Sequence, residues 1–109
     1  MHLFAIILDY VSDMASVDAV RGDHLQYIKP FQNQGIFLLS GPQAPRTGGF
    51  ILAQGENKAF FENIMDHDPF ILNGVAKYRV VVADITHCID PIMAAIIDNK
   101  TEHFDAPKN

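Results

Sequence analysis

Two short apolar segments, one near each end of the chain, constrain its fold most. Residues 3–8 have the sequence LFAIIL, and residues 75–85 contain the β-branched run Val80, Val81 and Val82. Continuous apolar runs of this length are typical of strands that are buried on both faces. We therefore expect two strands of one sheet, and this sheet needs cover on both of its sides.

The segment after the first strand has the periodicity of an amphipathic helix. Apolar and aromatic residues recur at spacings of three and four, which predicts a helix over residues 16–34 that ends at Gly35. This stripe consists of Val17, Val20, His24, Tyr27, Ile28 and Phe31. Pro30 lies inside the pattern and removes the backbone hydrogen bond to the carbonyl of Gln26, so a kink or an early end is expected.

Three more elements precede the second apolar segment. Residues 35–42 and 47–54 are short apolar segments bounded by glycine and proline, which predicts two further strands. Residues 56–66 place apolar side chains on one side of a helix. Pro69 is expected to end that helix, because proline biases the preceding residue away from helical geometry.

The order strand, helix, strand, strand, helix, strand predicts an α+β protein of ferredoxin-like, split βαβ topology with an antiparallel four-stranded sheet. A chain of 109 residues is long enough for one domain, which we assign to residues 1–88. Residues 89–109 are interpreted as a C-terminal extension, in which Asp90 and Pro91 open a short helix ahead of a polar tail.

Helices that lie on one side of such a sheet leave its other face open. Alternate residues of a strand point to opposite faces, so Ala5 and Ile7 share one face while Ile6 and Leu8 share the other. A monomer would expose an apolar sheet face, which is typical of an interface. We predict a homodimer, or a higher even oligomer, that packs sheet against sheet.

Charge and cysteine content exclude several kinds of partner and site. The formal net charge is -5 and the eight basic residues are scattered, which argues against nucleic acid binding. The single cysteine, Cys88, excludes an internal disulfide and is expected to be an inert thiol of a cytoplasmic protein. Metal-binding histidine spacings and glycine-rich phosphate loops are missing, and the N-terminal apolar run is too short to span a membrane. We expect no metal, no cofactor and no membrane association.

Two residues form a candidate acid/base pair. His24, taken alone, is interpreted as a core or boundary histidine, and Asp68, taken alone, as a turn carboxylate that accepts backbone hydrogen bonds. The two helices of a split βαβ unit pack side by side, so these side chains could converge. A positioned acid or base accelerates proton transfer by about 10² to 10⁴. His67 competes for this role, but a solvent-facing position at the helix end fits it better.

Other residues are weaker candidates for binding a substrate. Arg21 lies one helical turn before His24 and could hold an anionic group, although a solvated surface arginine is the more common case. Ser40 and Gly41 offer a hydroxyl and an unhindered backbone amide, although a strand-ending turn explains them equally well. Three aromatic residues could line a pocket or simply pack in the core: Phe4, Phe37 and Phe70.

Three segments in matching order resemble the signatures of the YciI-like (YCII domain) family. They are Arg21-Gly-Asp-His24-Leu, Gly35-Ile-Phe-Leu-Leu-Ser-Gly41-Pro42 and Asp68-Pro-Phe-Ile-Leu-Asn-Gly74-Val. The resemblance covers residues 1–85 and implies a dimeric α/β barrel of ferredoxin-like subunits, with the active-site histidine and aspartate of the family at His24 and Asp68. Pro30 and the extension after Ile85 depart from the family pattern.

The resemblance also implies a reaction, the dehydrochlorination of chlorinated hydroxyhydroquinones in aromatic degradation. We therefore predict a cofactor-independent lyase or isomerase that acts on a small hydroxylated aromatic substrate, with His24 as the base and Asp68 as its orienting partner. A non-catalytic module that binds a small ligand is the alternative. A purely structural dimerisation domain is a third interpretation.

Overall fold

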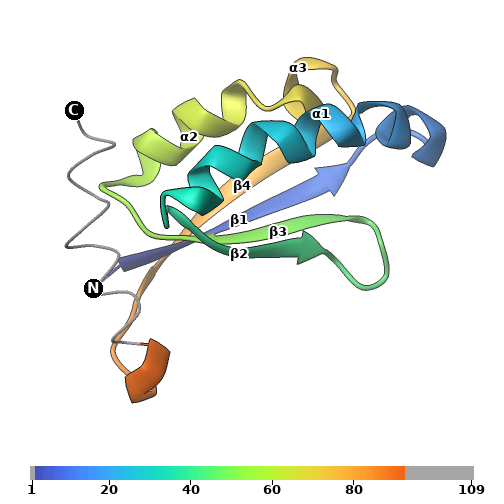
Figure 1. Ribbon diagram of the computed structural model, residues 1–109. Coiled ribbons are helices and arrows are strands. Elements are labelled where there is room, and N and C mark those ends of the chain that lie inside the picture. The colour runs from blue at the N-terminus through green and yellow to red at the C-terminus, as the bar shows by residue number, and fades with distance from the viewer. Residues whose placement is uncertain (1, 93–109) are drawn as a thin grey trace.

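A four-stranded antiparallel sheet with strand order β2-β3-β1-β4 forms the body of the protein. A computed structural model describes residues 2–92 (Figure 1). The elements are, in chain order, β1 (His2–Tyr10), α1 (Met14–Asn33), β2 (Phe37–Pro42), β3 (Gly48–Ala53), α2 (Lys58–Asp66), α3 (Pro69–Leu72) and β4 (Ala76–Asp84). This order and this strand arrangement are those of the predicted ferredoxin-like α+β class.

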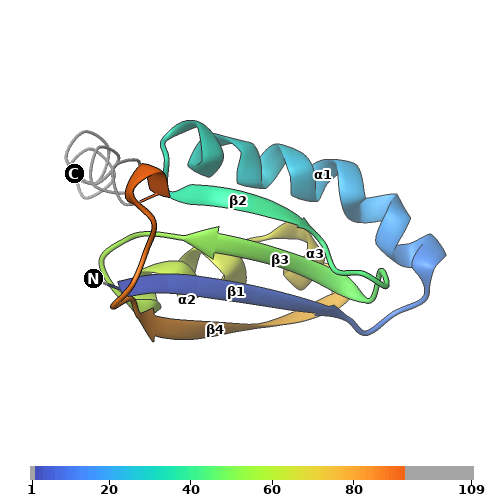
Figure 2. The same ribbon diagram turned by 90° about the horizontal axis from the view of Figure 1, so that it is seen from below.

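The three helices cover one face of the sheet and leave the other face open (Figures 1 and 2). On the covered face, Phe4, Ile6 and Leu8 of β1 are at most 1% exposed, and they form a core with residues of all three helices. Ala5 and Ile7 point to the open face and are only half-buried. The alternation that the sequence predicts for β1 is therefore present, and its two sides differ in burial.

Helix α1 begins two residues before the predicted range of 16–34 and ends one residue short of it, at Asn33. Its first residue is Met14, because the Asp13 side chain accepts a hydrogen bond of 2.8 Å from the backbone N–H of Ser16 and caps the helix. Of the kink or early end expected at Pro30, the early end is wrong, since the helix continues to Asn33. A proline in the last turn removes one backbone bond, and its own carbonyl still accepts the N–H of Gln34.

Gly35 ends α1 through backbone geometry. Its φ of 76° lies in the left-handed region, its N–H donates to the carbonyl of Gln32, and the next N–H, that of Ile36, donates to the carbonyl of Phe31. This is the Schellman arrangement that satisfies the last carbonyls of a helix. It also shortens the predicted strand, because residues 35 and 36 belong to the helix cap and β2 starts at Phe37.

A short helix that the sequence analysis did not predict follows α2. Helix α2 ends at Asp66, and α3 starts immediately after Asp68, which caps it. The same glycine motif closes α3, because Gly74 has a φ of 69° and the N–H groups of residues 74 and 75 donate back to Ile71 and Phe70. Pro69 therefore ends one helix and also occupies the first turn of the next.

The described part of the chain ends at the start of the predicted terminal helix. Residues 90–92 form a helical turn, in which the N–H of Ile92 donates to the carbonyl of Ile89. The rest of that predicted helix and the polar tail lie outside the described residues. Between residues 2 and 92, no helix has the length and apolar character needed to cross a membrane.

Candidate active site

The His24–Asp68 pair that the sequence suggested is formed in the structure. Nδ1 of His24 lies 2.9 Å from Oδ1 and 2.8 Å from Oδ2 of Asp68, although the two residues are 44 positions apart in the sequence. His24 comes from the buried stripe of α1, and Asp68 comes from the junction between α2 and α3. The packing of α1 against α3 on the sheet therefore brings the imidazole and the carboxylate together.

Asp68 is held rigidly at this junction. Its side chain is fully buried, and Oδ1 also accepts a hydrogen bond of 2.9 Å from the backbone N–H of Phe70. One carboxylate thus orients the histidine and caps α3 at the same time. A buried carboxylate is stable only when its oxygens are satisfied, and this double use satisfies both of them.

The orientation of His24 leaves one ring nitrogen for another molecule. An ionised carboxylate only accepts hydrogen bonds, so Nδ1 is the protonated nitrogen of the neutral ring and Nε2 is its basic nitrogen. Within residues 2–92, no hydrogen bond involves Nε2. The ring also stacks on Phe70, with a centroid distance of 4.1 Å and an interplanar angle of 13°. Both contacts fix the direction in which Nε2 can act.

His24 lines a small cavity between α1 and the β2–β3 hairpin. The predicted substrate-binding residues Arg21, Ser40, Gly41 and Phe70 lie around the same cavity. Its volume is about 70 Å³ and it opens to solvent. This is below the usual range for pockets that enclose a ligand, which begins at about 300 Å³. One subunit can therefore enclose only part of a compound with a single ring.

The polar groups around the cavity differ in their partners. The hydroxyl of Ser40 accepts a hydrogen bond of 2.6 Å from Nε2 of Gln32, which leaves its own proton for a ligand. Arg46 and Tyr10 line the cavity as well, and neither was predicted to do so from the sequence. The only sequence signal for Arg46 is its place in the connection between two predicted strands. This position in the sequence does not predict on which side of the sheet the Arg46 side chain lies.

Two of the suggested pocket walls belong to the core instead. Phe4 and Phe37 are 1% and 2% exposed, and both rings pack against Phe61. Neither residue lines the cavity. His67 is exposed, with Nδ1 at 2.8 Å from the carbonyl of Asn63, as expected of a residue at a helix end.

Tyr27 shows the effect of the buried carboxylate on its surroundings. Burial raises the pKa of Tyr27, and the charge of Asp68 raises it further. The phenol therefore stays protonated and donates a hydrogen bond of 2.6 Å to the carbonyl of Ile64. This bond ties α1 to α2 beside the His24–Asp68 pair. No group of three or more histidine, cysteine, aspartate or glutamate side chains that could hold a metal occurs among the described residues.

The fold and the site together define a ferredoxin-like α+β protein with a buried histidine–carboxylate pair beside an open cavity. The chain belongs to the family of YCII-related domains, whose family model matches residues 2–84. This confirms the resemblance carried by the three sequence segments. No curated protein matches the chain.

The solved structures that share this fold include the following two. One is 5-chloro-2-hydroxyhydroquinone dehydrochlorinase (TftG) from Burkholderia phenoliruptrix AC1100, in complex with 2,5-dihydroxybenzoquinone. It has a TM-score of 0.64 and 21% identity, over 79% of this chain and 95% of that one. The other is a protein from Deinococcus radiodurans assigned to the antibiotic biosynthesis monooxygenases, with a TM-score of 0.55 and 12% identity, over 83% of this chain and 97% of that one. At these identities the likeness confirms the predicted fold class.

Proposed function

We propose that this protein is a cofactor-independent lyase or isomerase that acts on a small hydroxylated aromatic compound. The observation that carries this proposal is the orientation of His24 by the buried Asp68, which presents a basic Nε2 next to an open cavity. A histidine that is held by a buried carboxylate is a device for proton transfer, because the carboxylate fixes the tautomer and stabilises the imidazolium that forms.

In the proposed reaction, Nε2 of His24 takes the proton of a ring hydroxyl. The resulting oxyanion collapses to a ketone, and the ring carbon that bears the leaving group takes up a proton. Chloride then leaves with the carbon–chlorine bond pair, and a second ring hydroxyl loses its proton. The net change is loss of HCl and formation of a quinone. No external oxidant is needed, because the chloride carries away the two electrons that the ring loses. Asp68 stabilises each imidazolium formed on the way.

The concrete substrate we propose is a chlorinated hydroxyhydroquinone. Support comes from the dehydrochlorinase TftG, which has the same fold and is known in complex with 2,5-dihydroxybenzoquinone. The open cavity also has room for part of a compound with one ring. The roles of Arg21, Ser40, Gly41 and Phe70 in this proposal are to position the ring against His24.

The test is chloride release from 5-chloro-2-hydroxyhydroquinone under anaerobic conditions. Wild type is expected to release chloride well above the rate without protein, and His24→Ala is expected to lose this activity while it remains folded. A matched control is His67→Ala, because His67 is exposed and does not line the cavity. Binding of the compound without chloride release would favour the alternative, a non-catalytic module that binds a small ligand.

We further infer that two copies pack through the open sheet faces. Residues directly opposite in neighbouring strands share a face, which places Leu39, Leu52, Ala5 and Val81 in one row across all four strands. Leu39 is 53% exposed and Val81 is 40% exposed, so this row is an apolar surface in a single chain. Figure 2 shows this face of the sheet, with α2 and α3 behind the strands and α1 beyond the β2 edge. Burying such a row is the usual reason for sheet-to-sheet association.

A further inference from the structure

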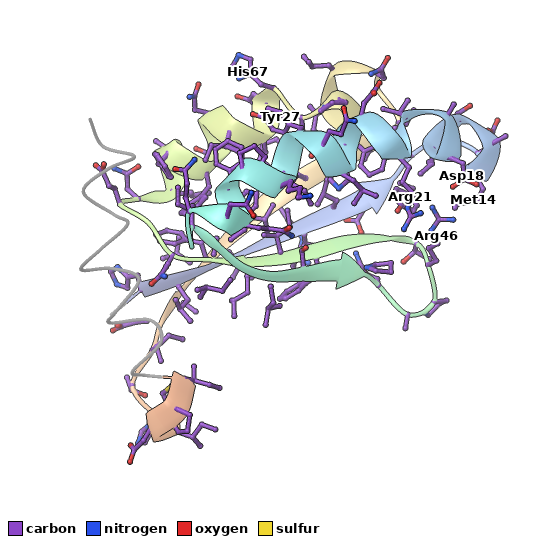
Figure 3. All side chains as sticks on the ribbon, viewed as in Figure 1. Met14, Asp18, Arg21, Tyr27, Arg46 and His67 are labelled. Atoms are coloured by element: carbon purple, nitrogen blue, oxygen red, sulfur yellow. The ribbon has the colours of Figure 1, made fainter. Side chains whose placement is uncertain are left out.

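Two arginines on opposite walls line the cavity that contains His24. Arg21 lies on α1, one turn before His24, and Arg46 lies in the connection between β2 and β3. Figure 3 shows their side chains in the same region between the first half of α1 and the hairpin, with Asp18 beside them. In a chain with a formal net charge of -5, two guanidinium groups at one cavity make a locally positive site.

Arg46 is held in place by one contact to α1 and one contact to β1. Its Nη2 lies 2.8 Å from Oδ1 of Asp18, and its guanidinium carbon lies 5.9 Å from the centre of the Tyr10 ring. The hairpin itself is tied to β1, because the backbone N–H of Tyr10 donates a hydrogen bond of 2.9 Å to the carbonyl of Thr47. The position of this positive charge is therefore defined by the fold.

Arg21 has no such partner. Within residues 2–92, no ion pair involves Arg21, and Asp18 is already paired with Arg46. The group of Arg21, Asp18 and Arg46 thus carries a formal charge of +1, which matches one negative charge on a ligand. Side chains three positions apart on a helix are neighbours, so an anion at Arg21 would lie beside His24.

We propose that Arg21 and Arg46 bind a carboxylate on the substrate ring, so that the full substrate is a chlorinated, hydroxylated aromatic acid and 5-chloro-2-hydroxyhydroquinone is its analogue without the carboxylate. A phenolic hydroxyl ionises near pH ~10 and a carboxyl near pH ~4, so at neutral pH the single negative charge on such a ring is a carboxylate. The guanidinium fork also matches the two oxygens of a carboxylate. This inference rests on the proposed function for the reaction at His24, and it adds Arg46 and the charge of the substrate.

The test compares two probes of the same shape, 2,5-dihydroxybenzoate and the neutral 2,5-dihydroxybenzamide, by calorimetric titration at low salt. Wild type is expected to bind the benzoate at least about tenfold more tightly than the benzamide, as charge-assisted hydrogen bonds require. Arg21→Gln and Arg46→Gln should reduce this preference severalfold. Lys29→Gln is the matched control, because it removes one positive charge from the exposed side of the same helix.

Asp18→Asn distinguishes anion binding from a purely structural ion pair. If Arg46 binds the carboxylate, Asp18→Asn removes a competing negative charge and strengthens benzoate binding, whereas Arg46→Gln weakens it. If the ion pair only fixes the hairpin, both substitutions weaken binding alike. Urea unfolding of each variant identifies any that fails to fold, and the charge-conserving Arg46→Lys then replaces Arg46→Gln.

Three results would overturn the inference: no benzoate binding, equal affinities of wild type for the two probes, or a parallel loss in Asp18→Asn and Arg46→Gln. The two probes carry no chlorine and binding is measured without turnover, so this experiment tests the arginine site alone. Benzoate binding in the expected pattern together with no chloride release from 5-chloro-2-hydroxyhydroquinone would count against the proposed reaction and leave this inference intact.

Discussion

The substitution Asp68→Asn probes the arrangement on which the proposed chemistry depends. Asparagine has nearly the same shape, and its Oδ1 can still accept the N–H of Phe70. Its amide group, however, would donate a hydrogen bond to Nδ1 of His24, where the carboxylate accepts one. The imidazole must then carry its proton on Nε2, and the basic nitrogen no longer faces the cavity.

The expected effects follow from these contacts. A hydrogen bond to a charged group contributes about 1.5 to 3 kcal/mol, so Asp68→Asn should lower the free energy of unfolding by about 2 kcal/mol. Activity should fall much further, by about 10⁴-fold, which is the loss seen when the orienting carboxylate of a serine–histidine–aspartate triad becomes an amide. Asp68→Ala removes the cap of α3 as well and should cost about 3 to 5 kcal/mol.

Urea unfolding measures the loss of stability, and nitrogen NMR of the imidazole identifies the protonated ring nitrogen. The matched control is Asp23→Asn, since Asp23 is exposed on the same helix as His24 and should change stability by less than about 0.5 kcal/mol. The reasoning is refuted if Asp68→Asn keeps the proton of His24 on Nδ1. It is also refuted if the substitution is as neutral for stability as the control.

Three further predictions concern the fold. Gly48→Ala would place a Cβ 1.8 Å from the carbonyl oxygen of Leu8, so it should destabilise the protein by about 3 kcal/mol or more, whereas Gly22→Ala has free space and should stabilise α1 by about 1 kcal/mol in urea unfolding. Burial and the hydrogen bond to Asp66 raise the pKa of Tyr78. The folded protein therefore retains this proton where the unfolded chain loses it, and the stabilising contribution is complete below about pH 10 and declines as the pH rises further. Unfolding free energies measured from pH 9 to 11 should fall more steeply in wild type than in Tyr78→Phe, and equal slopes would contradict this. Leu52→Lys on the open face should convert a dimer to a monomer in light scattering without lowering the helix content, and an unchanged mass would exclude this face as the interface.

The sequence by itself determined the kind and order of the main elements. The apolar runs of β1 and β4 and the stripe of α1 are local patterns, because the side-chain periods of strands and helices are set by backbone geometry. The glycine at the end of α1 is local in the same sense, since only the bonds of the last helical turn decide it. Each of these features could be predicted from a few neighbouring residues. Their order along the chain then predicts the ferredoxin-like class.

The tertiary structure decided what those patterns leave open. Helix α3 is four residues long, so it has no periodicity to detect, and its position is set by the burial of Phe70 in the core and by the contact of Asp68 with His24. Helix α1 continues past Pro30 because its last turns pack on the sheet, with Ile28 buried and the ring of Phe31 tilted by 41° against that of Phe37 at a centroid distance of 5.2 Å.

The candidate site depends on contacts across the fold. The residue types His24 and Asp68 could be chosen from the sequence, but their 2.8 Å contact results from how two helices pack on one sheet face. Arg46 reaches the cavity only because the β2–β3 hairpin turns toward α1 and pairs with Asp18. Periodicity fixes which face of an element a side chain occupies, whereas the distance between residues 44 positions apart is set by the packing of the whole core.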